Sequence, residues 1–191
     1  MHPTRRQTII AGLAGWQTSV ALSADTDPVA LLRAGGTVVA FRHALAPGTF
    51  DPPGFALGQC ATQRNLSEEG RDQARRIGAW FKAQQLVPAR VRASPWCRCV
   101  DTATLAFGSA QPWAALGSPS GQDQAVRAAR LQELRAALDT ASKQRGRFDV
   151  WVTHMFVLAD LTGQNTDSGD GLILRPGPDG RAQVVARLAV P

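Results

Sequence analysis

The stretch GGTVVAFRHALAPG, residues 35–48, decides the fold and raises a chemical question. Residues 37–41 form an apolar run that is rich in β-branched side chains, which predicts a buried strand. Arg42 and His43 follow directly at its end, and a loop begins after them. A cation and an imidazole at the tip of a core strand indicate a binding or catalytic site at that edge of the sheet.

Strand and helix patterns alternate along most of the chain. The patterns predict helices at 28–34, 66–86, 96–107 and 124–142, a further helix starting at 155, and strands at 37–41, 89–93, 148–154 and on both sides of a turn at 176–180. Residues 44–65 carry three prolines and three glycines without periodicity, which predicts a long functional loop. The fold class is therefore α/β, a three-layer sandwich with a mainly parallel central sheet flanked by helices and a C-terminal β-hairpin at one edge.

The composition is that of a soluble globular protein. Hydrophobic residues make up 44% and charged residues 19% of the 191 residues, and no long apolar run indicates a membrane span. The net charge of +6 favours anionic ligands. Basic residues are spread along the chain and tyrosine is absent, so no nucleic-acid partner is expected. No pattern indicates an oligomeric state.

Residues 1–24 have the plan of a secretory signal peptide. Arg5 and Arg6 precede a mildly apolar stretch that ends in small residues, which resembles a twin-arginine signal with cleavage after Ser23 or Ala24. We expect export to the periplasm, with residues 25–191 as a single domain. The alternative is a basic N-terminal tail on a cytoplasmic enzyme.

Three cysteines are consistent with one disulfide in an exported protein. Cys60 could bridge to Cys97 or to Cys99, and three buried thiols are the alternative. The Cys97-Arg98-Cys99 spacing does not fit a zinc or redox motif, so no metal site is predicted.

Two histidines and two arginines carry the predicted chemistry. His43 and His154 each end a buried strand, so their imidazoles would share a crevice if the two strands are neighbours. Arg98 starts the helix after another strand. Arg42, Arg98 and that helix N-terminus would suit a tetrahedral dianion such as phosphate. The pattern predicts phosphoryl transfer, whereas either histidine alone would be interpreted as structural.

Four segments resemble the histidine phosphatase superfamily, which includes cofactor-dependent phosphoglycerate mutases, acid phosphatases and phosphohistidine phosphatases. They are Arg42-His43-Ala44, NLSEEGRDQA, SPWCRCVDTA and VWVTHM, in the family's order over residues 37–163. The resemblance implies a phosphoglycerate mutase-like fold and a covalent phosphohistidine mechanism that needs no metal or cofactor.

Carried over by position, the resemblance implies a role for each site residue. His43 would be the nucleophile, Arg42 and Arg98 would clamp the phosphate oxygens, and His154 would donate a hydrogen bond to the transferring group. Apart from the resemblance, Arg64 lies just before the helix expected to flank the site, so it would add a third phosphate-binding cation or else be an exposed loop arginine.

The chain departs from the family pattern at three points. Ala44 and Met155 stand where many members have glycine, and no general acid is evident. The acidic residues in the segment that usually supplies the acid have the pattern of helix caps or solvated faces: Asp123, Glu133 and Asp139. Substrates with good leaving groups, such as phosphoramidates or aryl phosphates, are therefore expected over sugar phosphates.

The sequence thus predicts a phosphatase acting on a small anionic phosphorylated substrate. Specificity would lie in residues 44–65 and 107–124, with Trp96 as a candidate substrate contact. The alternatives are a catalytically weak phosphate-binding or interaction protein that retains the Arg/His cradle and, less favoured, a phosphotransferase of the phosphoglycerate mutase type.

Overall fold

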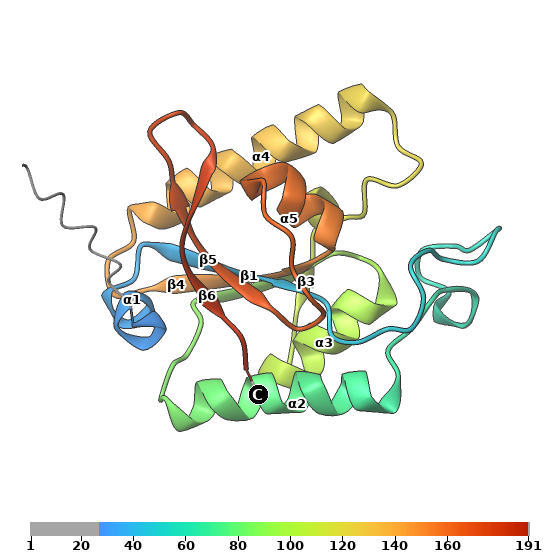
Figure 1. The fold of residues 1–191 in the computed structure, drawn as a ribbon, viewed down its shortest axis with the longest axis horizontal. Coiled ribbons are helices and arrows are strands. Elements are labelled where there is room, and N and C mark those ends of the chain that lie inside the picture. The colour runs from blue at the N-terminus through green and yellow to red at the C-terminus, as the bar shows by residue number, and fades with distance from the viewer. Residues whose placement is uncertain (1–26, 191) are drawn as a thin grey trace, which may run out of the picture.

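A six-stranded sheet with helices on both faces forms the protein (Figure 1). The computed structural model describes residues 27–190, so the predicted signal peptide lies outside the described residues. The strands run in the order β3-β2-β4-β1-β5-β6 across the sheet. Their bounds are Thr37–Arg42 (β1), Arg90–Ala93 (β2), Gln111–Pro112 (β3), Phe148–Thr153 (β4), Gly171–Pro176 (β5) and Ala182–Leu188 (β6).

Helices cover the two faces of the sheet unequally. The α-helices are α1 (Pro28–Ala34), α2 (Glu68–Ala83), α3 (Cys97–Phe107), α4 (Gln124–Ser142) and α5 (Met155–Thr162), with short 3₁₀ helices η1 (Cys60–Thr62) and η2 (Ala114–Leu116). In Figure 1, α4 and α5 lie on one side of the sheet, and α1, α2 and α3 lie on the other. The predicted three-layer α/β architecture is confirmed.

The central strands pair in parallel and the C-terminal pair is antiparallel. β1 pairs with β4 from Thr37↔Phe148 to Arg42↔Thr153, and β4 pairs with β2 on its other side. β5 runs antiparallel to β1, and β6 closes that edge as the predicted hairpin. The carboxyl ends of β1, β4 and β2 therefore meet at one edge of the sheet.

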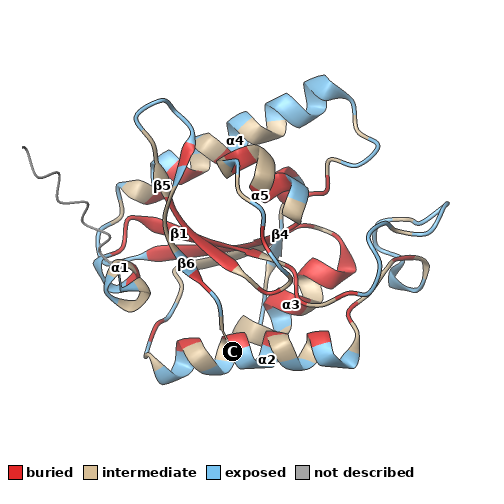
Figure 2. Ribbon diagram, in the orientation of Figure 1, coloured by how far each residue is buried: buried red, intermediate tan, exposed pale blue. Residues whose placement is uncertain are grey.

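The strand β1 is buried along most of its length (Figure 2), and its alternating side chains pack into two separate cores. Val39 and Phe41 join the cluster under α2 and α3, whereas Val38 and Ala40 join the cluster under α4 and α5. Both faces of the strand are buried, which explains why its sequence is continuously apolar rather than alternating.

The helix α2 begins as its sequence predicts and ends earlier than predicted. The Ser67 hydroxyl accepts a hydrogen bond from the Gly70 amide, and Glu68 and Glu69 lie in the positive first turn. The helix ends at Ala83 because Gln85 adopts a left-handed conformation (φ 56°). No sequence pattern predicted the two-residue strand β3.

Within residues 27–190, no helix combines the length and apolarity that a bilayer crossing requires.

Gly70 lets α2 lie directly against the chain that follows β1. A Cβ at this position would be 2.0 Å from the carbonyl oxygen of Leu45, two residues beyond His43. This close approach explains the glycine in the NLSEEGRDQA segment.

Replacing Gly70 by alanine should therefore destabilise the protein. Alanine is the better helix former, but the clash with backbone forces α2 and residue 45 apart, and we expect a net loss of about 1–3 kcal/mol in the free energy of unfolding. Urea denaturation followed by circular dichroism measures it. Lys82→Ala, at an exposed position of the same helix, is the control, and an equal effect of both changes would contradict the packing argument.

Candidate active site

The sheet topology brings the two predicted histidines together. His43 follows β1 and His154 follows β4, the neighbouring parallel strand. The two ring centroids are 5.6 Å apart, and both side chains are almost fully buried. The His43 amide donates to the Thr153 carbonyl (2.9 Å), so the strand pairing continues into the site itself.

One cavity collects all five predicted site residues. It has a volume of about 180 Å³, and its lining includes Arg42, His43, Arg64, Arg98 and His154. Segments 44–65 and 107–124 also contribute to it, as the sequence predicts, through residues that include Phe55 from the first and Ser118 from the second. The catalytic and binding roles of the five predicted site residues stay predictions.

The ring of His43 is held in one tautomer. Its Nδ1 lies 2.8 Å from the Ala44 carbonyl oxygen, which can only accept, so the ring proton is on Nδ1 and the lone pair is on Nε2. Burial lowers the pKa of His43 to about 3; the hydrogen bond to Ala44 opposes this shift, and the charges of Arg98, Arg64 and Arg42 reinforce it. At neutral pH Nε2 is therefore an unprotonated nitrogen.

His154 is held at both ring nitrogens. Nε2 lies 2.8 Å from the Ser94 hydroxyl, and Nδ1 lies 3.3 Å from the guanidinium NH2 of Arg98. The guanidinium only donates, so Nδ1 accepts and the ring proton is on Nε2. Burial and then the positive charge of Arg98 lower the pKa of His154 well below its usual value.

Three guanidinium groups make the cavity electropositive. Arg42, Arg64 and Arg98 line it together with one carboxylate, Asp51, so three positive charges and one negative charge leave +2 when the imidazoles are neutral. Their other anchors include the carbonyls of Thr166 for Arg42 and Ala46 for Arg64 (2.9 and 2.5 Å). The alternative of an exposed Arg64 is wrong.

Each of these arginines also carries a buried Nε that makes no hydrogen bond within the described part of the chain. Buried donors of this kind are normally satisfied by a ligand or water. A tetrahedral oxyanion offers several acceptors at once, and it matches the positive charge.

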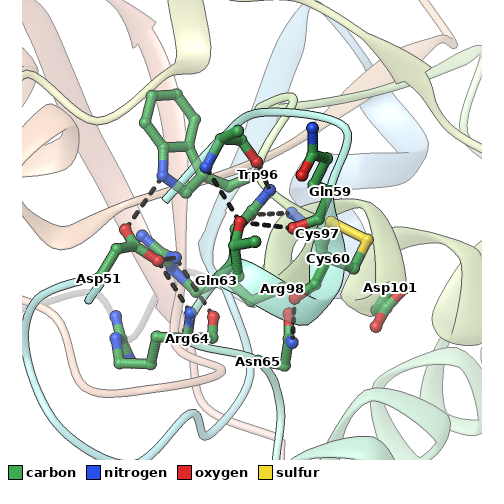
Figure 3. Close-up of a disulfide and its surroundings, with 12 residues drawn as sticks. Asp51, Gln59, Cys60, Gln63, Arg64, Asn65, Trp96, Cys97, Arg98 and Asp101 are labelled. Carbon is green, nitrogen blue, oxygen red and sulfur yellow. Dashed lines mark hydrogen bonds and ion pairs between the residues drawn. A yellow bond between two sulfur atoms is a disulfide. The ribbon is translucent and has the colours of Figure 1, made fainter. Parts of the chain in front are cut away.

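Asp51, which the sequence did not single out, is the carboxylate of the cavity (Figure 3). It accepts hydrogen bonds from the Arg98 guanidinium (2.8 Å), the Trp96 indole (3.1 Å) and the Arg64 amide (3.0 Å). Burial alone would raise the pKa of this carboxyl, but the hydrogen bonds and the charge of Arg98 outweigh burial and lower it. Asp51 is therefore ionised and holds Arg98.

A disulfide fixes the same loop beside Arg98. Cys60 is bonded to Cys97 (Figure 3). Cys99 is a free buried thiol. Of the two predicted pairings, the structure contains the one between Cys60 and Cys97 and not the one between Cys60 and Cys99. Gln63 adds a second link, because its side-chain oxygen accepts from the Cys97 amide at the start of α3.

Two side chains from the segments that resemble the family, Thr102 and Gln73, hold the backbone after His43 through hydrogen bonds. The Thr102 hydroxyl donates to the Arg98 carbonyl (2.6 Å) and accepts from the Ala44 amide (3.0 Å). Gln73 bridges the Leu45 amide and the Ser168 carbonyl. Ala44 has no positive φ, so its backbone does not require the glycine that the sequence resemblance leads us to expect there.

The three acidic residues of the expected acid segment lie outside the cavity, as their sequence pattern predicts. Asp123 caps α4 through the Ala125 amide, Glu133 accepts from the Trp113 indole, and Asp139 pairs with Lys143. Among residues 27–190 no cluster of His, Cys, Asp and Glu side chains could hold a metal ion.

Comparisons with known proteins find similarity in structure only. No protein-family model matches the sequence, and no curated protein matches it. The protein histidine phosphatase SixA complexed with tungstate is 20% identical, with 80% of this chain and 96% of that protein aligned and a TM-score of 0.53. A mycobacterial glucosyl-3-phosphoglycerate phosphatase complexed with VO3 is 18% identical over 78% and 97%, with a TM-score of 0.57.

A phosphoserine phosphatase from Entamoeba histolytica, in complex with 3-phosphoglyceric acid, is 11% identical over 80% of this chain and 96% of that protein, with a TM-score of 0.57. The predicted resemblance to the histidine phosphatase superfamily is thus confirmed at the level of the fold.

The neutral buried histidines should make stability depend on pH. The folded pKa values lie below the unfolded value of about 6.5, so unfolding takes up protons below that pH. We expect the free energy of unfolding to fall as the pH drops from about 6.5 toward 3, by up to about 2.7 kcal/mol per pH unit if both imidazoles take up a proton. Urea denaturation across this range, for wild type and for His43→Gln, measures it; identical slopes in the two proteins would exclude the contribution of His43.

Removing the carboxylate of Asp51 should leave Arg98 buried without an ion partner. We expect Asp51→Ala to lower the free energy of unfolding by about 3–5 kcal/mol, and added inorganic phosphate to restore part of the loss by offering Arg98 new acceptors. The control is Asp139→Ala, whose exposed pair with Lys143 should contribute less than about 1 kcal/mol. Equal losses in the two variants would contradict this role of Asp51.

Proposed function

We propose that this chain, which has the fold of the histidine phosphatases, is a phosphatase that hydrolyses phosphomonoesters or phosphoramidates through a phosphohistidine at His43. One observation carries the proposal: an unprotonated imidazole nitrogen and three guanidinium groups share one buried cavity. Phosphoryl transfer needs an oriented nucleophile and concentrated positive charge around the transferring group, and these residues supply both.

In the first step, Nε2 of His43 attacks the phosphorus atom. The N–P bond forms as the bond from phosphorus to the leaving group breaks, and the leaving group departs with the electron pair. The Nδ1–H bond to the Ala44 carbonyl stabilises the positive charge that develops on the ring. Arg42, Arg64 and Arg98 neutralise the phosphoryl oxygens.

His154 would assist by donating from Nδ1, which requires a change of tautomer. In the structure, Nδ1 of His154 accepts from Arg98. The Ser94 hydroxyl can reverse its bond and donate to Nε2, because it is both donor and acceptor. The proton then lies on Nδ1, where it can be donated to a phosphoryl oxygen.

In the second step, water attacks the phosphorus of the phosphohistidine. The P–N bond breaks, its electron pair returns to Nε2, and inorganic phosphate leaves. The water loses one proton, and the leaving group of the first step gains one from solvent, so the overall reaction is hydrolysis. No step needs a metal ion.

Relatives in fold support the class of reaction. Their names describe phosphatases of protein histidine, glucosyl-3-phosphoglycerate and phosphoserine, and one of the structures contains tungstate. Among the described residues, the carboxylate that lines the cavity is Asp51, which is ionised and so cannot act as a general acid. Substrates with basic leaving groups are therefore disfavoured, because an unassisted alkoxide leaves slowly. Phosphoramidates and aryl phosphates are therefore the favoured substrates.

We also propose export to the periplasm. The signal-like sequence of residues 1–24 suggests it. The disulfide between Cys60 and Cys97 supports it, because such bonds persist mainly in oxidising compartments.

The test is hydrolysis of 4-nitrophenyl phosphate with a chelator present. We expect turnover by wild type, a loss of at least about a thousandfold in His43→Ala, and a trapped phosphoenzyme that is stable in alkali and labile in acid, as a P–N bond requires. Glu133→Gln, outside the cavity and able to accept from Trp113 as glutamate does, is the control and should keep wild-type activity.

Two results would overturn the proposal. Equal turnover by wild type and His43→Ala would exclude His43 as the nucleophile. Vanadate binding without any turnover would favour the alternative of a phosphate-binding protein that retains the cradle.

A further inference from the structure

Exposed aromatic rings gather at the cavity that holds the two histidines. Six large apolar side chains are exposed among the described residues, and three of them line this cavity. These three, Phe50, Phe55 and Phe156, are also the aromatic ones, and we call them the aromatic rim. Phe50 is 66% exposed and Phe55 and Phe156 are 36% and 37% exposed, so they lie where the cavity opens to solvent.

The aromatic rim comes from two elements. Phe50 and Phe55 belong to the loop after β1, which Asp51 and the disulfide fix against α3. Phe156 belongs to the first turn of α5, two residues after His154. The rim is therefore supported by the same contacts that position the phosphate cradle.

An aromatic path connects the rim with the cradle. The Phe55 ring lies 6.1 Å from the Trp96 ring, and Trp96 makes an edge contact with His154 at 5.3 Å. The indole nitrogen of Trp96 is engaged by Asp51. Trp96 therefore presents an apolar ring to the cavity rather than a free donor.

Charge is confined to the cradle. The charged residues that line the cavity are the three arginines and Asp51, and the remaining polar lining groups outside the imidazoles are neutral hydroxyls: Thr49, Ser118 and Ser120. Within residues 27–190, a second carboxylate, phosphate or ammonium on the substrate would find no charged side chain in the cavity lining beyond the cradle. Burying such a group unpaired is unfavourable.

From these observations, and resting on the proposed function, we infer that the substrate's leaving group is an uncharged aromatic ring that contacts the aromatic rim. The cavity of about 180 Å³ accommodates the phosphate and part of the ring, since benzene alone fits a cavity of about 150 Å³. The rest of the ring would contact the exposed phenylalanines. Edge and offset contacts between rings stabilise such a complex beyond simple burial.

Non-hydrolysable phosphonates separate recognition from catalysis. Binding of benzylphosphonate and of methylphosphonate to the full chain is measured by calorimetry. We expect benzylphosphonate to bind about 10-fold more tightly to wild type. Each of Phe50→Ala, Phe55→Ala and Phe156→Ala should reduce this ratio about 3- to 10-fold and leave methylphosphonate binding within twofold. Leu57→Ala, an exposed apolar residue of the same loop outside the cavity, should leave both affinities unchanged.

A kinetic comparison separates ring recognition from leaving-group reactivity. Phenyl phosphate is compared with a fluorinated alkyl phosphate whose alcohol is about as acidic as phenol. We expect the aryl ester to have the higher kcat/KM in wild type and the difference to shrink in Phe50→Ala. Phe50→Leu, which keeps an apolar side chain without a ring, should shrink it as well.

The outcomes distinguish this inference from the proposed function. Equal binding of the two phosphonates, or ratios that none of the phenylalanine changes alters, would overturn the inference even if 4-nitrophenyl phosphate is hydrolysed. Preserved preference for benzylphosphonate without turnover of any ester would support the rim but overturn the phosphatase. Circular dichroism of each variant identifies any loss of folding, in which case the Phe50→Leu kinetics decide.

Discussion

The parallel pairing of β1 with β4 is the constraint on which the site depends. Its register sets Arg42 opposite Thr153, so the next residue of each strand is a histidine. A shift by one residue would turn Val39 and Phe41 toward the other layer and disrupt both cores. The burial that stabilises the fold therefore also fixes the separation of the imidazoles. The pairing of β2 on the far side of β4 adds Ser94 and the start of α3 to the same edge.

The second principle of the site is the coexistence of close cations with neutral histidines. Burial disfavours the imidazolium form of both rings, and the charges of Arg42, Arg64 and Arg98 disfavour it further, so both imidazoles remain neutral. Asp51 offsets part of the positive charge and keeps one guanidinium in place. The same positive charge that would suit a dianion thus keeps Nε2 of His43, the nitrogen proposed to attack, free of a proton.

Local patterns were enough to predict most of the fold and the tips of the strands. The continuous apolar runs that end at His43 and His154, and the Ser67 cap of α2, are signals within a few residues. The contact between Asp51 and Arg98 spans 47 residues and starts in a loop without periodicity, so no local pattern could indicate it. Cys97 and Cys99 are two residues apart and face different sides of α3, so the choice between them depends on the direction of that loop. The β3 strand is too short for a pattern, and the tautomers follow only from distances.

The disulfide also changes what the protein is when it is not folded. Cys60 and Cys97 close a covalent ring that contains α2 and β2, with Arg98 as the first residue after it. In a polymer description, a ring of this length reduces the configurational entropy of the denatured ensemble, which raises the free energy of that ensemble by about 4 kcal/mol at 25 °C. The loop that carries Asp51 and the helix that carries Arg98 therefore remain neighbours even in a fully denatured chain. The proposed reaction uses no sulfur atom, yet the stability of the site depends in part on surroundings that are oxidising enough to keep this disulfide formed.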